Sequence, residues 1–215
     1  MAETAAEYDA SPFVPEERSL EKLREAAADC RGCPLYEPAT QTVFGEGVSR
    51  ARVIFVGEQP GDREDIEGTP FVGPAGRELD RGLEDVGIDR KDAYVTNVVK
   101  HFKFKERGKR RIHQKPGARE ERACRPWLEA ELEALEPEVF VCLGSTAAQA
   151  LLGRDFRVTR QRGQWLDSAL APNVMATVHP SSIIRERDDR ARAEARREFQ
   201  ADLTMVAQAL NGTRG

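Results

Sequence analysis

The chain has 215 residues, with 33 Lys and Arg against 37 Asp and Glu and a formal net charge of −4 at pH 7. This length fits one domain, and 40% apolar residues can build a core of ordinary size, so we expect a monomer. No stretch is apolar enough to span a membrane, and the amino terminus lacks the basic and apolar regions of an export signal. These features predict a cytoplasmic protein with no membrane partner.

Short apolar runs alternate with helix-like segments along the chain. In order, we predict a helix over 19–28, a strand over 53–57, a helix over 74–86, a strand over 94–99, a helix over 118–135, a strand over 139–143, a helix over 145–152, a strand over 174–178 and a helix over 190–210. This alternation predicts a three-layer α/β/α fold with a mainly parallel, four-stranded central sheet. Residues 1–17 are expected to form a mobile acidic tail and residues 18–211 a single domain.

Basic residues are concentrated between Lys100 and Lys115. This window holds eight Lys and Arg against the single acidic residue Glu106, so it carries +7 and the rest of the chain −11. Such asymmetry indicates a polyanion-binding edge on an acidic body, although a solvated basic loop without a partner has the same composition. Phe102 and Phe104 lie among the cations and favour nucleic acid, because bases stack on aromatic rings, although both could equally be core residues at the end of a strand.

Polar residues follow the predicted strands at the points where those strands end. Glu58 lies in the turn Gly-Glu-Gln-Pro-Gly after the first strand, Asn97 lies in the second, and His179 follows the fourth. In open α/β sheets, ligands bind at the carboxyl ends of the strands. We therefore expect these side chains to meet on one rim, with His113 in the basic loop that leaves it.

The four cysteines suggest a metal site. Cys30 and Cys33 form a C-x-x-C, while Cys124 and Cys142 lie far downstream. A cytoplasmic chain is not expected to use them as disulfides. Four thiols suit zinc or a [4Fe-4S] cluster equally well, and Cys124 and Cys142 could instead be ordinary buried thiols.

In this order, the motifs resemble the iron–sulfur uracil-DNA glycosylases of family 4, and most closely their UdgX branch. The resemblance covers about residues 30–210 and rests on the cysteines, the turn at 57–61, the segment 70–76, the strand at 96–102 and His179-Pro180-Ser181. The loop Lys109-Arg110-Arg111-Ile112-His113 marks the branch, as does Gln59 where family 4 usually has Ala. The resemblance implies a uracil-DNA glycosylase-like fold and a [4Fe-4S] cluster bound by Cys30, Cys33, Cys124 and Cys142.

The resemblance also implies roles at the rim. Phe71 would stack on the extruded uracil, Asn97 would pair with its N3–H and O4, and Gly57 and Gln59 would complete the uracil site. His179 would stabilise the negative charge that grows on the departing base. The basic residues expected to hold the loop against the DNA backbone are Lys109, Arg110, Arg111 and Lys115.

His113 matches the residue that attacks the sugar in this branch. The resemblance implies a covalent bond between its imidazole and C1′ of the abasic sugar, with Glu58 and Gln59 assisting. The partner would be uracil-containing DNA, preferably single-stranded, because extruding a base costs less there. Two alternatives remain: a turnover glycosylase that uses an activated water, and a non-catalytic single-strand-binding module with a structural cluster.

Overall fold

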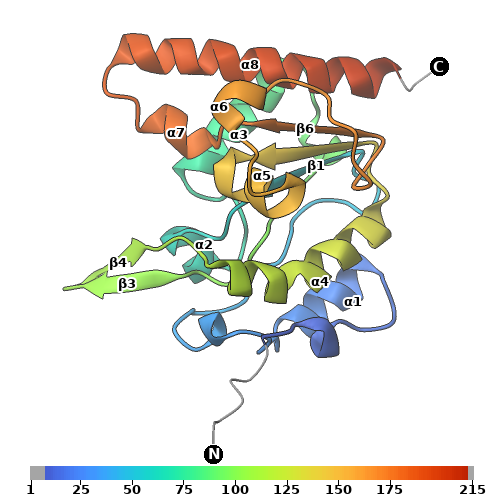
Figure 1. Ribbon diagram of the computed structural model, residues 1–215, viewed down its shortest axis with the longest axis vertical. Helices are drawn as coiled ribbons and strands as arrows, with labels where there is room; N and C mark the ends of the chain where they lie inside the picture. Colours follow the sequence, from blue (N-terminus) through green and yellow to red (C-terminus); the bar gives the residue numbers. More distant parts are fainter. Residues whose placement is uncertain (1–7, 213–215) are drawn as a thin grey trace, which may run out of the picture.

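The central sheet consists of four parallel strands in the computed structural model, which describes residues 8–212 (Figure 1). The strands are β1 (Val53–Gly57), β2 (Ala93–Asn97), β5 (Val139–Leu143) and β6 (Asn173–Thr177), in the order β2-β1-β5-β6. All but the first residue of β6 are buried, as continuous apolar runs predict for a sheet covered on both faces. The predicted parallel sheet is confirmed.

Helices cover both faces of the sheet. On one face, Ile54 and Val56 pack in a core shared with α1 (Leu20–Ala27), α4 (Ala118–Leu135), α5 (Gly144–Leu152) and α6 (Val158–Gln161). On the other, Val53 and Phe55 pack against α3 (Pro74–Asp85), α7 (Pro180–Ile184) and α8 (Asp189–Gly212). Figure 1 shows α8 above the sheet and α4 with α1 below it. The three-layer arrangement predicted from the sequence is therefore present.

The basic window forms a β-hairpin that projects from the body (Figure 1), where the sequence predicts a loop. Strands β3 (Phe104–Arg107) and β4 (Arg110–His113) pair antiparallel, and Phe104 lies opposite His113. Gly108 has a φ of 60° in the two-residue turn, a conformation that such hairpin turns need and glycine adopts without strain. The strands are mostly exposed and polar, so no apolar alternation marks them in the sequence.

Part of the predicted acidic tail is packed on the body. Ala10 is only 1% exposed, and its N–H donates to the carbonyl of Ala123 at 2.9 Å. The Arg119 guanidinium lies 4.6 Å from the ring centre of Tyr8. These contacts hold residues 8–17 against α4, so this part of the predicted mobile tail is packed. Residues 1–7 lie outside the described part.

The remaining elements are short. They are α2 (Asp62–Glu67) after β1, and the 3-10 helices η1 (Ser11–Phe13), η2 (Pro34–Tyr36) and η3 (Arg90–Asp92). Between residues 8 and 212, no helix is both long enough and apolar enough to cross a membrane.

The chain order of the strands defines a switch point. From β1 the chain moves outward to β2, and it then returns to the opposite side of β1 to form β5. The loops that follow β1 and β5 therefore leave in different directions, and the space between them is where open α/β sheets bind ligands.

Candidate active site

A cavity of about 970 Å³ opens at this switch point. It is lined by the turn after β1, the loop that carries Phe71, the end of β2, the start of α5, the end of β4 and the start of α7. The predicted residues Glu58, Asn97, His113 and His179 all line this cavity. The convergence expected from the strand ends is therefore observed, although it needs the hairpin to bring His113 to the rim.

His179 is held as a neutral ring with one defined tautomer. Its Nδ1 accepts the backbone N–H of Ser181 at 3.1 Å and lies 2.9 Å from the Ser181 hydroxyl. Because a backbone N–H can only donate, Nδ1 carries no proton and the ring proton is on Nε2. Desolvation lowers the pKa of His179 to about 4, and the charges of Arg185 and His113 act in the same direction. At neutral pH, His179 therefore offers an N–H donor without a positive charge.

Phe71, Gly57 and Asn97 meet beside His179. The Phe71 and His179 rings stack at 6.0 Å with 25° between their planes. A Cβ on Gly57 would lie 2.4 Å from Asn97 Oδ1 and 3.0 Å from the Phe71 ring, so only glycine fits at the end of β1. The Asn97 amide, buried at the end of β2, makes no hydrogen bond to another described residue. An unpaired amide beside an aromatic ring is suited to pair with the edge of a stacked base.

The backbone of Phe71 is strained. Its φ is 59°, which is uncommon for a bulky residue and costs of order 1–3 kcal/mol. A Cβ on Gly76 would lie 1.5 Å from the Phe71 carbonyl oxygen. The Phe71 backbone can therefore take this conformation beside α3 only because residue 76 is glycine. The strained backbone directs the ring into the cavity.

His113 and Glu58 face each other at the mouth of the cavity. His113 Nε2 lies 3.5 Å from Glu58 Oε1, with the two side chains 51% and 21% exposed. That carboxylate oxygen is buried and has no hydrogen-bond partner among the described residues. A buried acceptor left unpaired is costly, which indicates that a donor from outside the described residues completes its hydrogen bonding.

Gln59 lines the cavity and also holds the hairpin. Its side-chain amide bonds to the two segments at the base of the hairpin. Nε2 donates to the carbonyls of Lys103 at 3.2 Å and Gln114 at 3.0 Å, while Oε1 accepts the N–H of Lys103 at 3.0 Å. Both amide protons are used, so Gln59 fixes the hairpin to the turn that carries Glu58, and its predicted contact with uracil stays a prediction.

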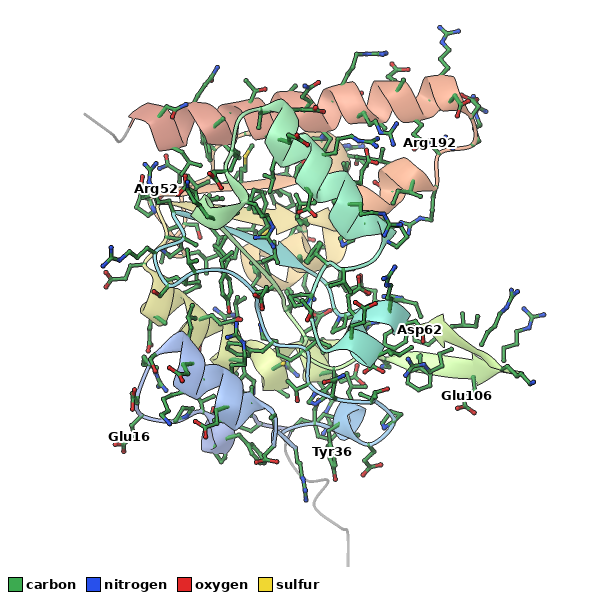
Figure 2. The ribbon with its side chains drawn as sticks, turned by 180° about the vertical axis from the view of Figure 1, so that it is seen from behind. Glu16, Tyr36, Arg52, Asp62, Glu106 and Arg192 are labelled. Atoms are coloured by element: carbon green, nitrogen blue, oxygen red, sulfur yellow. The ribbon has the colours of Figure 1, made fainter. Side chains whose placement is uncertain are left out.

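Arg111 is also engaged within the protein. Its guanidinium pairs with Asp62 and Asp65, each at 2.6 Å, and lies over the rings of Phe102 and Phe104 at 5.5 and 5.0 Å. Figure 2 shows Asp62 on α2 beside the hairpin. These contacts hold Arg111 against α2, and its predicted contact with the DNA backbone stays a prediction.

The other three predicted backbone contacts remain accessible. Lys109 and Arg110 lie exposed at the tip of the hairpin, and Lys115 lies exposed two residues beyond His113. None forms an ion pair with a described residue. They fit the expected role in position and charge.

Glu64 joins two loops of the site, a role that was not predicted from the sequence. One carboxylate oxygen accepts the N–H of Gly61 and the other the N–H of Gly73, each at 3.0 Å. Glu64 thus joins the turn after β1 to the loop that carries Phe71. The signal was present as a capping box, since Glu64 lies three residues beyond the glycine that begins α2.

Comparison with known proteins identifies the family. The model of the uracil DNA glycosylase superfamily matches residues 44–204. The chain belongs to the uracil DNA glycosylase superfamily. A type-4 uracil-DNA glycosylase from Thermotoga maritima is 38% identical over 177 residues, covering 82% of this chain and 88% of the relative. One from Archaeoglobus fulgidus is 33% identical over 197 residues, covering 88% and 92%.

The four cysteines of this superfamily member do not form one group. All four are buried and free of disulfides. Cys30, Cys33 and Cys124 interact electrostatically, whereas burial is the only influence on the pKa of Cys142. Within residues 8–212, no three His, Cys, Asp or Glu side chains are arranged closely enough to hold a metal ion. Cys142, on β5 in the middle of the sheet, is therefore not among the electrostatic neighbours of the other three thiols.

N–H donors reach all three neighbouring thiols, and Cys33 receives the backbone N–H of Leu35. The Trp127 indole donates to Cys30 Sγ at 3.2 Å, and the backbone N–H of Lys100 donates to Cys124 Sγ at 3.3 Å. Such donors stabilise thiolates, and hydrogen bonds to sulfur are a recurrent feature of iron–sulfur sites. The chemistry of these three residues therefore fits a cluster.

Lys100 belongs to the core and not to the basic surface. Its ammonium is 1% exposed and pairs with the equally buried Glu131 at 2.5 Å, while it also donates to Thr96 Oγ1 and to the carbonyl of Asn97. Tyr94 donates to the same carboxylate. This network links α4 to the strand that ends in Asn97, and it removes one charge from the predicted basic surface.

Proposed function

We propose that this protein excises uracil from DNA and then becomes covalently attached to the abasic sugar through His113. The observation that carries the proposal is the buried, unpaired Glu58 oxygen 3.5 Å from His113 Nε2, at the mouth of the cavity that contains Asn97 and His179. A phosphate-binding histidine would need no buried carboxylate beside it. The type-4 names of the relatives support the excision step, and the position of His113 supports the capture step.

The geometry suits a dissociative reaction. As the bond between C1′ and uracil N1 breaks, the electron pair moves onto the uracil ring, and the Nε2–H of His179 can donate to the oxygen where charge accumulates. The carboxylate of Glu58 stabilises the positive charge that develops on the sugar. Asn97 and Phe71 hold the extruded base by pairing and stacking.

Capture follows when an imidazole nitrogen of His113 donates its lone pair to C1′. The new bond replaces the one to uracil, and the proton displaced from the ring is accepted by Glu58 or the departing uracil anion. The product is an alkylated imidazole without an obvious hydrolytic exit. Each molecule should therefore react once.

A denaturing gel with a single-stranded oligonucleotide containing one uracil tests this proposal. The wild type should give a uracil-dependent, heat-stable protein–DNA band, and His113→Ala should give none. Ile112→Ala is the matched control, because Ile112 is the exposed neighbour of His113 on the same strand and should leave the band intact.

The free uracil released in the same reactions separates the alternatives. Release limited to one equivalent per wild-type molecule supports capture. Release in large excess would instead show a turnover glycosylase, and binding that ignores uracil would show a non-catalytic module. A band of unchanged strength in His113→Ala would overturn the assignment of the nucleophile.

We also propose that the protein binds a [4Fe-4S] cluster through Cys30, Cys33 and Cys124. A fourth ligand besides these thiols would be needed, and we propose His101 in place of Cys142. His101 is buried, and the peptide N–H just before it donates to Cys124 Sγ. When bound, the cluster would fasten the C-x-x-C segment to α4; the excision chemistry described above does not pass through it.

Iron and sulfide content per chain should distinguish the cysteines. Cys33→Ala and His101→Ala are expected to lose most of the iron and the visible absorbance, because each removes a proposed ligand. Cys142→Ala should keep both, since Cys142 is not a ligand in this proposal. Equal iron loss in Cys142→Ala and Cys33→Ala, with folding confirmed by circular dichroism, would restore the four-cysteine assignment.

We further propose that the protein acts as a monomer and prefers single-stranded DNA. An unstacked base reaches the cavity without the cost of opening a duplex. The exposed cations at the hairpin tip can follow a flexible backbone.

A further inference from the structure

A second groove lies beside the active-site cavity. It has a volume of about 450 Å³ and runs between the first half of α4 and α5. Thr146, at the start of α5, lines both the groove and the active-site cavity, so the two adjoin. The groove also begins close to the hairpin, because Lys115 is two residues beyond His113.

Cations outnumber acidic residues in the lining of this groove. Lys115, Arg122, Arg125 and Arg154 contribute positive charges, and Glu121 is the only acidic residue among the lining residues. Arg125 pairs with Glu129 at 2.8 Å, whereas the other three cations form no ion pair with a described residue.

Glu121 opposes a bound anion only weakly. Burial raises its pKa, although Lys115 and Arg154 pull it in the other direction. Its side chain lies between cations that outnumber it, so the field in the groove stays positive. No aromatic residue lines the groove, which leaves the bases of a nucleic acid without a ring on which to stack.

We propose that this groove binds the phosphates of the DNA strand next to the target uracil. The occupant is the backbone of single-stranded DNA, held by Lys115, Arg122 and Arg154 without sequence readout. A strand whose uracil occupies the cavity can continue past Thr146 into the groove. The proposal rests on the action of this protein on uracil-containing DNA and does not depend on covalent capture by His113.

The groove can be tested with uracil-free oligothymidylate, which cannot react. Arg122→Gln/Arg154→Gln removes two exposed cations of the groove. Arg50→Gln/Arg197→Gln is the control with the same charge change: Arg50 precedes β1 at the opposite end of the strands, and Arg197 lies on α8 across the sheet. Neither control residue forms an ion pair with a described residue.

Fluorescence anisotropy should show the difference as a function of salt. For the groove variant, we expect affinity to fall roughly tenfold near 50 mM salt and the slope of log K against log salt to shrink by about 1.4, since each lost contact to a single strand contributes about 0.7. The control should change both by much less. Equal changes in the two variants would overturn the proposal, because they would reflect net charge alone.

Uracil-containing oligonucleotides of two lengths provide an independent readout. A short oligonucleotide that ends beside the uracil should react equally with wild type and groove variant, because it does not reach the groove. A long one should react faster than the short one with wild type, and the groove variant should lose that advantage. If the long oligonucleotide kept its whole rate advantage over the short one in the groove variant, this would contradict a role for the groove, whether or not a cross-link forms.

Discussion

His179→Ala is expected to lower the single-turnover rate of uracil excision by roughly 10²–10³-fold, the effect typical of removing one preorganised donor to a developing anion. Ser181 fixes the ring with its proton on Nε2, and Phe71 stacks against the ring face. The donor is therefore oriented before the substrate arrives. Rapid-quench measurement of released uracil checks the rate, and DNA affinity should change little.

Ser181→Ala is the matched control for this variant. It removes the hydroxyl near Nδ1 but keeps the backbone N–H that defines the tautomer. Its excision rate should therefore stay within about tenfold of wild type, since the His179 ring keeps its proton on Nε2. A larger loss in Ser181→Ala than in His179→Ala would contradict the proposed role of the ring.

The low pKa of His179 adds a pH criterion. Because the pKa lies at about 4, the ring stays neutral from pH 8 down to about pH 5. Protonation below that range would place a proton on Nδ1 and break its bond to the Ser181 N–H. The excision rate should accordingly show no titration of His179 above about pH 5.

Gln59→Ala is expected to reduce cross-linking relative to excision by roughly 10–100-fold, because it releases the hairpin that positions His113. The variant loses three hydrogen bonds to the hairpin base, at Lys103 and Gln114. A displacement of about 1 Å of a reacting group can cost about 10²-fold in rate. The ratio of cross-linked protein to free uracil, measured in one reaction, reports this partition.

Gln114→Ala is the control for Gln59→Ala. The Gln114 side chain only donates to the neighbouring carbonyl of His113, and its backbone carbonyl still accepts from Gln59 after the substitution. The partition should therefore stay close to wild type. An unchanged partition in Gln59→Ala would show that other contacts, such as the Arg111 ion pairs, suffice to hold the hairpin.

The sheet and the long helices could be predicted because their apolar residues face a core. The helix predicted over 118–135 has the observed bounds of α4, and the strand predicted over 53–57 has those of β1. The hairpin could not be predicted in this way. Its residues are mostly polar and exposed, and it is held by Arg111 and Gln59 through partners distant in sequence.

The sequence predicts which residues line the site better than it predicts what each side chain contacts. Strand ends and a family resemblance placed Glu58, Asn97 and His179 on one rim, because parallel strands end at one edge. The contacts of the other predicted residues depend on where their side chains point. The Gln59 amide bonds to the base of the hairpin, and Cys142 has no electrostatic interaction with the other thiols; neither outcome follows from spacing along the chain.

The composition of the basic window likewise does not predict how many of its charges are accessible. Three of its eight cations are paired inside the protein: Lys100 with Glu131, Lys103 with Glu120 and Arg111 with two aspartates. The accessible charge of the hairpin is therefore smaller than the +7 of the sequence. Additional cations come from α4 and from Arg154 just after α5, which the window does not include.

Mass spectrometry of the protein–DNA product tests the central claim most directly. Wild-type protein is incubated with a single-stranded oligonucleotide that contains one uracil, and the product is digested with nuclease and protease before peptide sequencing. We predict a single deoxyribose adduct on the imidazole of His113. An adduct on a lysine such as Lys109 or Lys115, or no adduct despite complete uracil release, would contradict it.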